Sequence, residues 1–419
     1  MVQINISFLK PGMKLLSDLT TPQGNLLLPA GSLLDERIIN RCKKWGVVQA
    51  DVESPEQSGQ EDWTEIDPEL LSQAKTQVQE LFCRHRHPSQ FIKVLAGDIV
   101  KQKAAALASE ESAPLEAEEL QQQEPTFSKQ ELDLPKLDAD RIVSNTEELA
   151  SLPEVFAKII NTLNDPDTTA DSLAEIISYD VNLSAKLIKL VNSPLYGLIQ
   201  KVDSISRAIS LLGLQTVKNL AVNASVMEMF KDLSPDLLDM HSFWKHSIAC
   251  GVVAQLLWGS SGRKGGEVFF LSGTLHDIGR LIILKDHPEY MRAVLLHPER
   301  GQKPLYQLEK KIWGFTHFEL GAKLITSWNF PLIFSDLVKY HHFPKKARYE
   351  GEATNIHFAD IIVHALELGE SGEKNVPPVE AEFNKDLGVS LKDLRELLEQ
   401  IKHLVHHIQN IFFQEKDEE

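Results

Sequence analysis

A histidine and an aspartate stand side by side in the apolar stretch LSGTLHDIGRLIIL, residues 271–284. Burying two such groups costs several kcal/mol each unless they find partners, by a rough general estimate. Two interpretations are open. Either His276 and Asp277 form a satisfied polar pair inside a helical core, or they bind a metal ion through an imidazole nitrogen and a carboxylate oxygen.

More histidines lie on apolar helices on either side of this pair. His246 falls on the apolar face of the predicted helix HSFWKHSIACGVVAQLLW. Gly279 is expected to end the helix that carries His276 and Asp277. In GFTHFELGAKLITSW, the Thr316-x-x-Glu319 pattern predicts a capping box,. That box would place the intervening His317 in the first helical turn.

Two further segments add histidines and an acid. His341 and His342 end the predicted helix PLIFSDLVKYHH. In TNIHFADIIVHAL, Asp360 shares one helix face with His357 and His364, three residues before it and four after it,. We expect these last two histidines to orient the ligand residues, or to have a structural role, rather than to be ligands themselves.

Together these residues have the chemistry of a metal centre. Imidazole and carboxylate groups suit iron, manganese, zinc or a similar divalent ion. A carboxylate can bridge two ions, and ions ~3.5–4 Å apart can activate water and hold a phosphoryl group. Any one of these histidines alone is more often an ordinary core or surface residue, so only the set favours a metal. The candidate ligands are His246, His276, Asp277, His317, His341, His342 and Asp360.

The composition is that of a globular protein in a reducing compartment. Hydrophobic residues make up 42% of the 419 residues and charged residues 25%,. The formal net charge of −17 disfavours general binding to nucleic acid or to anionic membranes,. Cys42, Cys83 and Cys250 are far apart, which argues against a disulfide framework or a cysteine zinc site,. With no signal-peptide pattern and no apolar run that could span a bilayer, we expect a cytoplasmic protein.

The chain is long enough for two or three folding units. Residues 1–55 alternate short apolar runs with turn signals, which predicts a small β-rich domain containing one helix, LDERIINRCKKWG,. Residues 56–140 predict a helical segment interrupted near Pro88 and then, over 108–140, an acidic flexible linker,. From residue 141 the periodicity is helical throughout, so the predicted fold class is mainly α.

Several motifs, in order, resemble the metal-ligand pattern of the HD superfamily of phosphohydrolases. They are FWKHS, LHDIGRL, THFELGAKLITSWNFP and KYHHFP, followed by Asp360. The closer resemblance is to the HDOD branch, whose preceding helical subdomain is matched by LPEVFAKII, NSPLYG and AISLLG. It covers about residues 141–365 and implies an HDOD domain over 141–419, with subdomains at 141–235 and 236–419. The segment around LKPGM is more weakly similar to the small domain that precedes HD-GYP phosphodiesterases.

The resemblance implies a role for each candidate. The first ion would be bound by His246, His276, Asp277 and Asp360. Asp277 would bridge it to a second ion, held by His317, His341 and His342. Arg280 stands where HD-GYP enzymes have a lysine and could bind a phosphate through two hydrogen bonds,. Asp277 and Arg280 are therefore the candidate catalytic residues.

One departure from the enzymes is clear. After His342 the text reads FPKKARYEGEAT, without a Gly-Tyr-Pro tripeptide, so hydrolysis of cyclic di-GMP is not supported. Lys345, Lys346 and Arg348 form a small positive cluster in this loop, which is more readily explained as a solvated surface,.

Two functions follow from the resemblance. HDOD proteins are mostly bacterial signalling modules, often without known catalysis, which implies a cytoplasmic regulatory protein with a signalling protein as partner. The alternative is a metal-dependent phosphohydrolase acting on a nucleotide or cyclic nucleotide, because the ligand set is complete. In that case a phosphate-containing small molecule would be the ligand.

Overall fold

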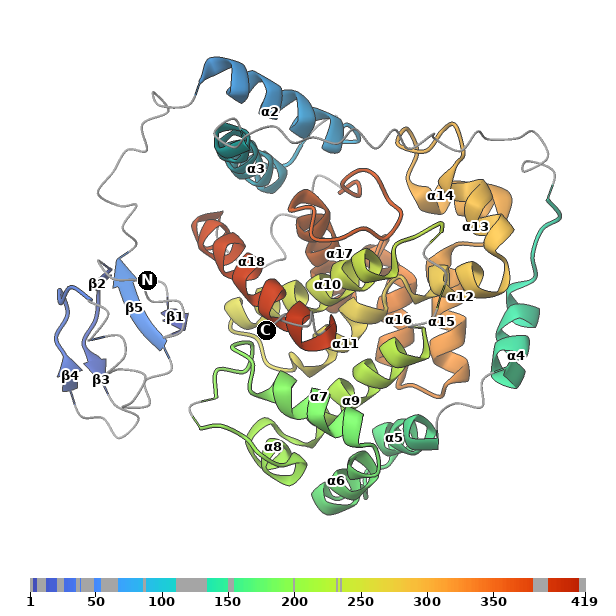
Figure 1. The fold of residues 1–419 in the computed structure, drawn as a ribbon, viewed down its shortest axis with the longest axis horizontal. Coiled ribbons are helices and arrows are strands. Elements are labelled where there is room, and N and C mark those ends of the chain that lie inside the picture. The colour runs from blue at the N-terminus through green and yellow to red at the C-terminus, as the bar shows by residue number, and fades with distance from the viewer. Residues whose placement is uncertain are drawn as a thin grey trace.

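Helices dominate the computed structural model, and the strands lie in the N-terminal part of the chain (Figure 1). The structure describes residues 3–5, 13–20, 26–34, 38, 49–53, 67–85, 88–110, 134–149, 154–198, 200–230, 233, 236–379 and 391–413. The predicted fold class is confirmed. Among the described helices, none has both the length and the apolar character needed to cross a membrane.

The N-terminal unit contains two small antiparallel sheets. One has the order β1-β5-β2, and the other pairs β3 with β4. The strands are β1 (Gln3–Asn5), β2 (Lys14–Leu15), β3 (Leu19–Thr20), β4 (Leu26–Leu28) and β5 (Gln49–Glu53). Met13, Leu15 and Leu19 are buried, as the alternation of apolar runs and turns predicts. The helix predicted from LDERIINRCKKWG falls almost entirely outside the described residues.

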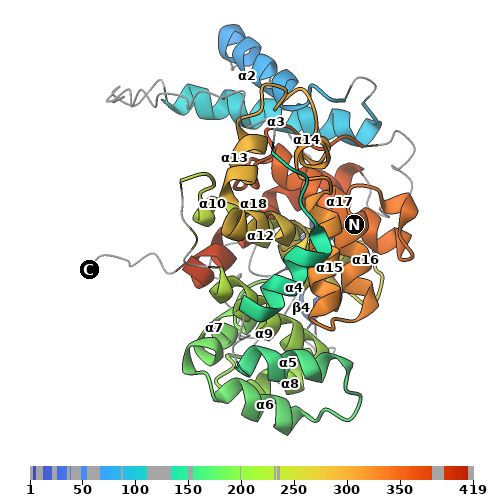
Figure 2. The same ribbon diagram turned by 90° about the vertical axis from the view of Figure 1, so that its right-hand side faces the viewer.

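A helical hairpin, α2 (Pro68–Leu81) and α3 (Gln90–Glu110), follows. The two helices break around Pro88, where proline disfavours a continuous helix, as predicted,. The end of α2 is joined to a distant loop, because the backbone N–H of Val376 donates to the carbonyl of Leu81 over 3.0 Å. The hairpin thereby lies on the helical body at the end opposite to α5, α6 and α8 (Figures 1 and 2).

Most of the predicted linker, residues 111–133, lies outside the described residues. The part after it is docked rather than free. The backbone N–H of Leu137 donates to Trp313 O over 2.9 Å, and the Tyr290 hydroxyl donates to Pro135 O over 2.7 Å. The predicted domain boundaries at 55, 140 and 235 stay predictions.

Six further described helices follow the hairpin and come before the segment that carries the candidate ligands. They are α4 (Ala139–Leu149), α5 (Glu154–Asn164), α6 (Ala170–Ser178), α7 (Val181–Val191), α8 (Ile205–Leu212) and α9 (Leu214–Met229). Local signals set their ends. Asp180 caps α7 by accepting from Leu183 N, and Gly213 ends α8 at φ 87°, a conformation that glycine adopts without strain,.

The candidate ligands lie on the next group of elements. These are α10 (Met240–Ser260), α11 (Glu267–Leu275), α12 (Ile278–Asp286), α13 (Pro288–Leu295), α14 (Leu305–Ile312), α15 (His317–Ser327), α16 (Leu332–Tyr340), the 3-10 turn η5 (Pro344–Lys346) and α17 (Glu350–Ala365). A last helix, α18 (Leu391–Phe413), packs against α10. Most of α10 and α17 is buried, so polar side chains on these helices must find partners inside the core,.

Glycine lets two helix pairs approach closely beside the ligands. A Cβ on Gly273 of α11 would lie 2.6 Å from Gly251 Cα of α10. A Cβ on Gly279 would lie 2.1 Å from the carbonyl oxygen of His317. The prediction that Gly279 ends a helix was wrong, because α11 stops at Leu275 and Gly279 lies inside α12. The requirement at Gly279 is space against α15, not a turn.

Candidate metal centre

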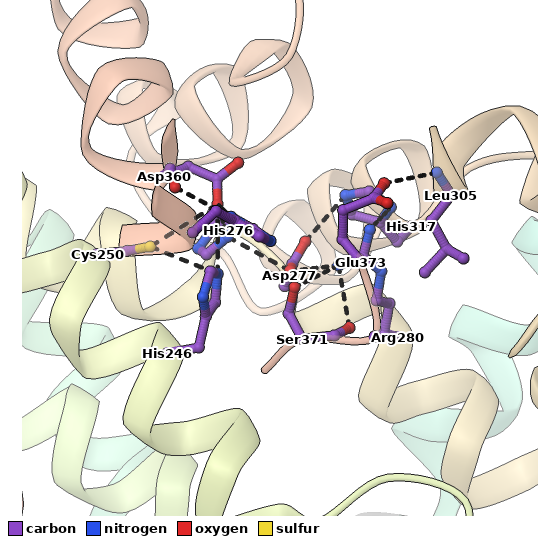
Figure 3. Close-up of polar contacts among 12 residues, drawn as sticks. His246, Cys250, His276, Asp277, Arg280, Leu305, His317, Asp360, Ser371 and Glu373 are labelled. Carbon is purple, nitrogen blue, oxygen red and sulfur yellow. Dashed lines mark hydrogen bonds and ion pairs between the residues drawn. The ribbon is translucent and has the colours of Figure 1, made fainter. Parts of the chain in front are cut away.

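All seven predicted ligands lie together in the interior of the helical body. His246 comes from α10, His276 and Asp277 from the junction of α11 and α12, His317 from the start of α15, His341 and His342 from the end of α16, and Asp360 from α17. Six of them are at most 2% exposed, and His342 is partly buried. Their ligand atoms fall into overlapping groups within 4.8 Å, which could each hold an ion. Figure 3 shows His246, His276, Asp277, His317 and Asp360 in this arrangement.

Helix ends place the ligands that lie between helices. His276 is the last residue associated with α11, and Asp277 stands before α12 without capping it through its side chain. The Asp277 carboxylate is therefore free to face the centre. In α15, Thr316 caps the helix in the predicted capping box with Glu319, so His317 follows a cap that is already satisfied,.

Backbone carbonyls fix the orientation of two histidine rings. Nδ1 of His276 lies 2.6 Å from Gly273 O, and Nδ1 of His341 lies 2.7 Å from Val338 O. A carbonyl can only accept, so each Nδ1 carries the proton and donates it. This leaves the Nε2 of each neutral ring with a lone pair, which is the arrangement found in metal-binding histidines.

The lone pairs face other acceptors. His276 Nε2 lies 3.4 Å from Asp277 Oδ2 and 3.7 Å from Asp360 Oδ1. His317 Nε2 lies 3.0 Å from Asp277 Oδ1 and 3.4 Å from His341 Nε2. His276 Nε2 and Asp277 Oδ1 are buried and have no hydrogen-bond partner. Acceptors that face each other repel unless a proton or a cation lies between them, so this donor set fits divalent metal ions.

Cys250 belongs to this group, although the spacing of the cysteines argued against a cysteine zinc site. Its Sγ lies 3.5 Å from His246 Nε2 and 4.0 Å from Asp360 Oδ1. Burial, followed by the charges of Asp360 and Asp277, raises the pKa of the Cys250 thiol well above its ordinary value. The available signal was its position one helical turn after His246 on the same face.

Arg280 lies behind Asp277 and is 2% exposed. Its Nη1 donates to Asp277 Oδ2 over 2.5 Å and to Ser371 Oγ over 3.0 Å, and its Nε donates to Glu309 Oε1 over 3.0 Å. The guanidinium is thus shared between two carboxylates and a loop. Figure 3 shows its contacts with Asp277 and Ser371. Burial alone would raise the pKa of Asp277, but Arg280, His276 and His317 outweigh it and lower it well below its ordinary value.

Glu309 is a second residue that the sequence argument missed. It is fully buried, and its Oε2 accepts from His317 Nδ1 over 2.6 Å and from His317 N over 2.8 Å. Burial would raise its pKa, but His317 and Arg280 lower it. A carboxylate behind a histidine in this way orients the ring and makes its other nitrogen a better ligand. Glu309 could have been suspected because α14 buries Leu305, Leu308 and Ile312 beside it.

The two histidines expected behind the site differ in their contacts. His364 Nδ1 lies 2.9 Å from Asp360 Oδ1 and 3.0 Å from Asp360 O. His357 is 3% exposed and lines a separate small cavity.

The pKa values of two neighbouring rings move apart. Burial, and next the nearby His364, lower the pKa of His246 to about 4. Burial also acts to lower the pKa of His276, but Asp277 and Asp360 more than offset it and raise this pKa to about 9. The centroids of the two rings are 5.4 Å apart, and both rings are buried. His246 faces one carboxylate and His276 faces two, and this difference decides whether the pKa falls or rises,.

Residues 149–344 match the family model of the HDOD domain. The chain carries an HDOD domain. The matched segment includes α5–α16 and all the candidate ligands except Asp360. An uncharacterised protein of Treponema pallidum (strain Nichols) is 25% identical over 243 residues, which are 57% of this chain and 46% of that protein. The matched part therefore spans less than half the length of this relative.

Two solved structures share the fold of the HDOD region. One, named "Putative phosphohydrolase", from Shewanella amazonensis SB2B, is 24% identical and covers 65% of this chain and 97% of its own, with a TM-score of 0.53. The other, named "Putative signal transduction protein", from Marinobacter aquaeolei VT8, is 20% identical and covers 64% of this chain and 61% of its own, with a TM-score of 0.52. At these identities the likeness is one of fold.

Proposed function

We propose that this chain is a bacterial signalling protein that acts through a protein partner and whose HDOD domain holds divalent metal ions. The observation that carries the proposal is the set of acceptors that face one another in the buried centre. His317 Nε2 lies 3.0 Å from Asp277 Oδ1, and no hydrogen bond satisfies that oxygen. The name of the Marinobacter aquaeolei structure with the same fold supports the signalling role.

Each residue has a proposed part in holding the ions. His246, His276 and Asp360 would hold a first ion, and His317, His341 and His342 a second. Asp277 would contact both, and Cys250 is close enough to His246 and Asp360 to join the first group. Arg280 keeps Asp277 ionised, and Glu309 orients His317. We infer iron, manganese or zinc, because imidazole and carboxylate ligands suit these ions.

A second function, a metal-dependent phosphohydrolase, has its own support. None of the ligand positions that the HD pattern requires is lost, and the Shewanella amazonensis structure with the same fold carries a phosphohydrolase name. Divalent ions in such a centre activate water and stabilise charge on phosphoryl oxygens. The role of this chain would be to keep Asp277 deprotonated and to exclude bulk water from the buried ligands. Arg280 would bind a phosphate directly only if it left its contact with Glu309. Otherwise it would contribute by keeping Asp277 in place and ionised.

Elemental analysis of full-length protein purified without added metal tests the first proposal. We expect at least one iron, manganese or zinc ion per chain, with a large loss in Asp360→Ala. His287→Ala, which changes a histidine outside the centre, should keep the metal. A wild-type protein free of these metals, and unaffected in stability when they are added, would overturn the proposal.

Turnover of a panel of phosphate monoesters, cyclic nucleotides and linear nucleotides by the metal-loaded protein tests the second function. Activity that disappears in Asp277→Asn would support it. A metal-loaded protein without turnover on the panel would leave the regulatory role alone.

A further inference from the structure

A small cavity adjoins the metal centre. Its volume is about 60 Å³, and its walls are His342, Phe343, Pro344, Lys345, Lys346, His357 and Pro378. His342 belongs both to this cavity and to the candidate ligand group with His317 and His341. The cavity is therefore one side chain away from the centre. Two of its lining residues, Lys345 and Lys346, belong to the predicted solvated loop and are exposed.

Two histidines in the cavity walls have unsatisfied nitrogens. His357 is 3% exposed, and its Nδ1 is buried without a hydrogen-bond partner. Both ring nitrogens of His342 are likewise buried and unpartnered. His342 can offer one nitrogen to an ion and still keep the other for a second contact. Buried polar groups are normally paired, so these atoms indicate a ligand with hydrogen-bonding oxygens.

The charge of the walls selects the sign of that ligand. The lining residues include two lysines and no carboxylate, in a chain whose formal net charge is −17. Lys346 is exposed, and its ammonium lies 4.9 Å from the centre of the Phe343 ring, which also lines the cavity,. A local positive site on an acidic protein attracts anions from solution.

The size of the cavity selects the group. One water needs roughly 10–15 Å³ of cavity volume, so 60 Å³ accommodates a few waters or one tetrahedral anion,. A whole nucleotide needs a pocket of several hundred Å³, in the range of about 300–1,000 Å³ for organic ligands. The ligand can therefore place one phosphoryl group here, with any remainder outside.

We propose that this cavity binds a phosphate group, with Lys346 and His357 as its main contacts. The role of this site in binding a substrate or effector rests on the proposed function. It places the ligand class among phosphate and phosphate monoesters, next to the metal centre but on its own residues. Binding at the cavity does not itself require the metal.

Equilibrium dialysis of radiolabelled inorganic phosphate against full-length, chelator-treated protein tests the proposal. We expect one saturable site per chain. Lys346→Gln and His357→Asn should each weaken binding about ten-fold, as for loss of one strong hydrogen bond. Lys339→Gln, which removes an exposed lysine of α16 outside this cavity, should leave binding unchanged. Competition by phenyl phosphate would assign the site to an ester, and its failure would assign the site to free phosphate.

Absence of saturable binding would overturn the proposal, as would equal weakening by Lys346→Gln and Lys339→Gln. Metal content, measured on the same samples before chelation, separates this result from the fate of the metal centre. Wild-type protein that binds phosphate but contains no metal would contradict the proposed function and leave this site standing. Metal-containing protein that binds no phosphate would overturn the phosphate site and leave the proposed function standing.

Discussion

The two halves of the candidate centre are built differently, although they share His276. The Asp277 half consists of Asp277, Arg280, Glu309 and His317, and the Asp360 half of His246, Cys250, Asp360 and His364. In the first, a buried arginine lies between two carboxylates. In the second, a single carboxylate lies among imidazoles and a thiol.

The difference shows in the partners of the two aspartates. Asp277 has a fixed positive charge 2.5 Å away in Arg280, which no accessible pH removes,. Asp360 depends on histidines, and it is His364, at 2.9 Å, that most strongly favours its charged form against the cost of burial. We conclude that Arg280 compensates the charge of Asp277 at any accessible pH, whereas the charge of Asp360 is compensated only by protonated histidines or by a cation.

The largest expected effect comes from Asp277→Ala. It removes a carboxylate from both ion groups and leaves Glu309 as the one carboxylate in contact with Arg280. Breaking such a buried pair costs about 3–5 kcal/mol of folding free energy. Loss of bound metal adds about 2.7 kcal/mol when free metal is 100-fold above Kd. The measurement is the melting temperature with and without chelator. Wild type should lose stability to the chelator, and Asp277→Ala should not.

Asp203→Ala, a change at an exposed aspartate, should behave like wild type in that experiment. Identical melting curves of wild type with and without chelator would mean that Asp277 serves only the Arg280 network.

Glu309→Ala should be the next most severe, at about 3–5 kcal/mol, because it takes one carboxylate from Arg280 and the acceptor from His317. Glu309→Gln keeps the shape and one acceptor oxygen, so it should cost less, about 1–3 kcal/mol. Urea unfolding in the presence of chelator measures the free energy of unfolding of the metal-free protein. A Glu309→Ala protein within 0.5 kcal/mol of wild type, about the effect of a neutral surface change, would refute the distinction between the halves.

His364→Gln tests the Asp360 half alone. His364 supports Asp360 from behind, and loss of such a partner typically lowers metal affinity about 10–100-fold. The measurement is competition for the metal by a chelator of known affinity. His357→Gln is the matched control on the same helix, where we expect less than about a two-fold change because this ring lines the adjoining cavity,. Equal losses in both variants would point to general damage to α17.

The smallest expected effect is in the pH dependence of the metal-free protein. The lowered pKa of His246, about 4, gives stability that is present above pH 6.5 and lost as the pH falls toward 4,. The raised pKa of His276, about 9, gives stability that is present below pH 6.5 and lost as the pH rises toward 9,. Each of these two rings should contribute a slope of at most about 1.4 kcal/mol per pH unit, in addition to other buried histidines whose pKa values are shifted in the same directions,.

Urea unfolding in chelator at pH 5, 6.5 and 8.5 measures both limbs. His246→Asn should make the acid limb shallower and His276→Asn the alkaline one, because other buried histidines still contribute to each limb. Added metal should remove the alkaline limb, since it displaces the proton from His276. A wild-type protein with the same stability at the three pH values would contradict both assignments.

Much of the fold was predictable from the sequence because its signals are local. The capping box at Thr316 and Glu319 and the break near Pro88 depend on neighbouring residues in the chain, and both are confirmed. The apolar periodicity of the helices has the same origin, since burial of one helix face is set by a 3.6-residue repeat. The candidate ligands could also be named, because each histidine or acid interrupts such an apolar face.

What the sequence by itself determined, then, is the helices and the residues on them that need a partner. Only the tertiary structure decided which partners they meet. The missing side chain of Gly279 leaves room for α15 to approach α12 closely, and Glu309 faces His317 because α14 packs behind the centre. Arg280 turns to Glu309 rather than to open solvent for the same reason. Contacts between residues distant in the chain depend on how whole helices pack, and periodicity along one helix carries no information about its neighbours.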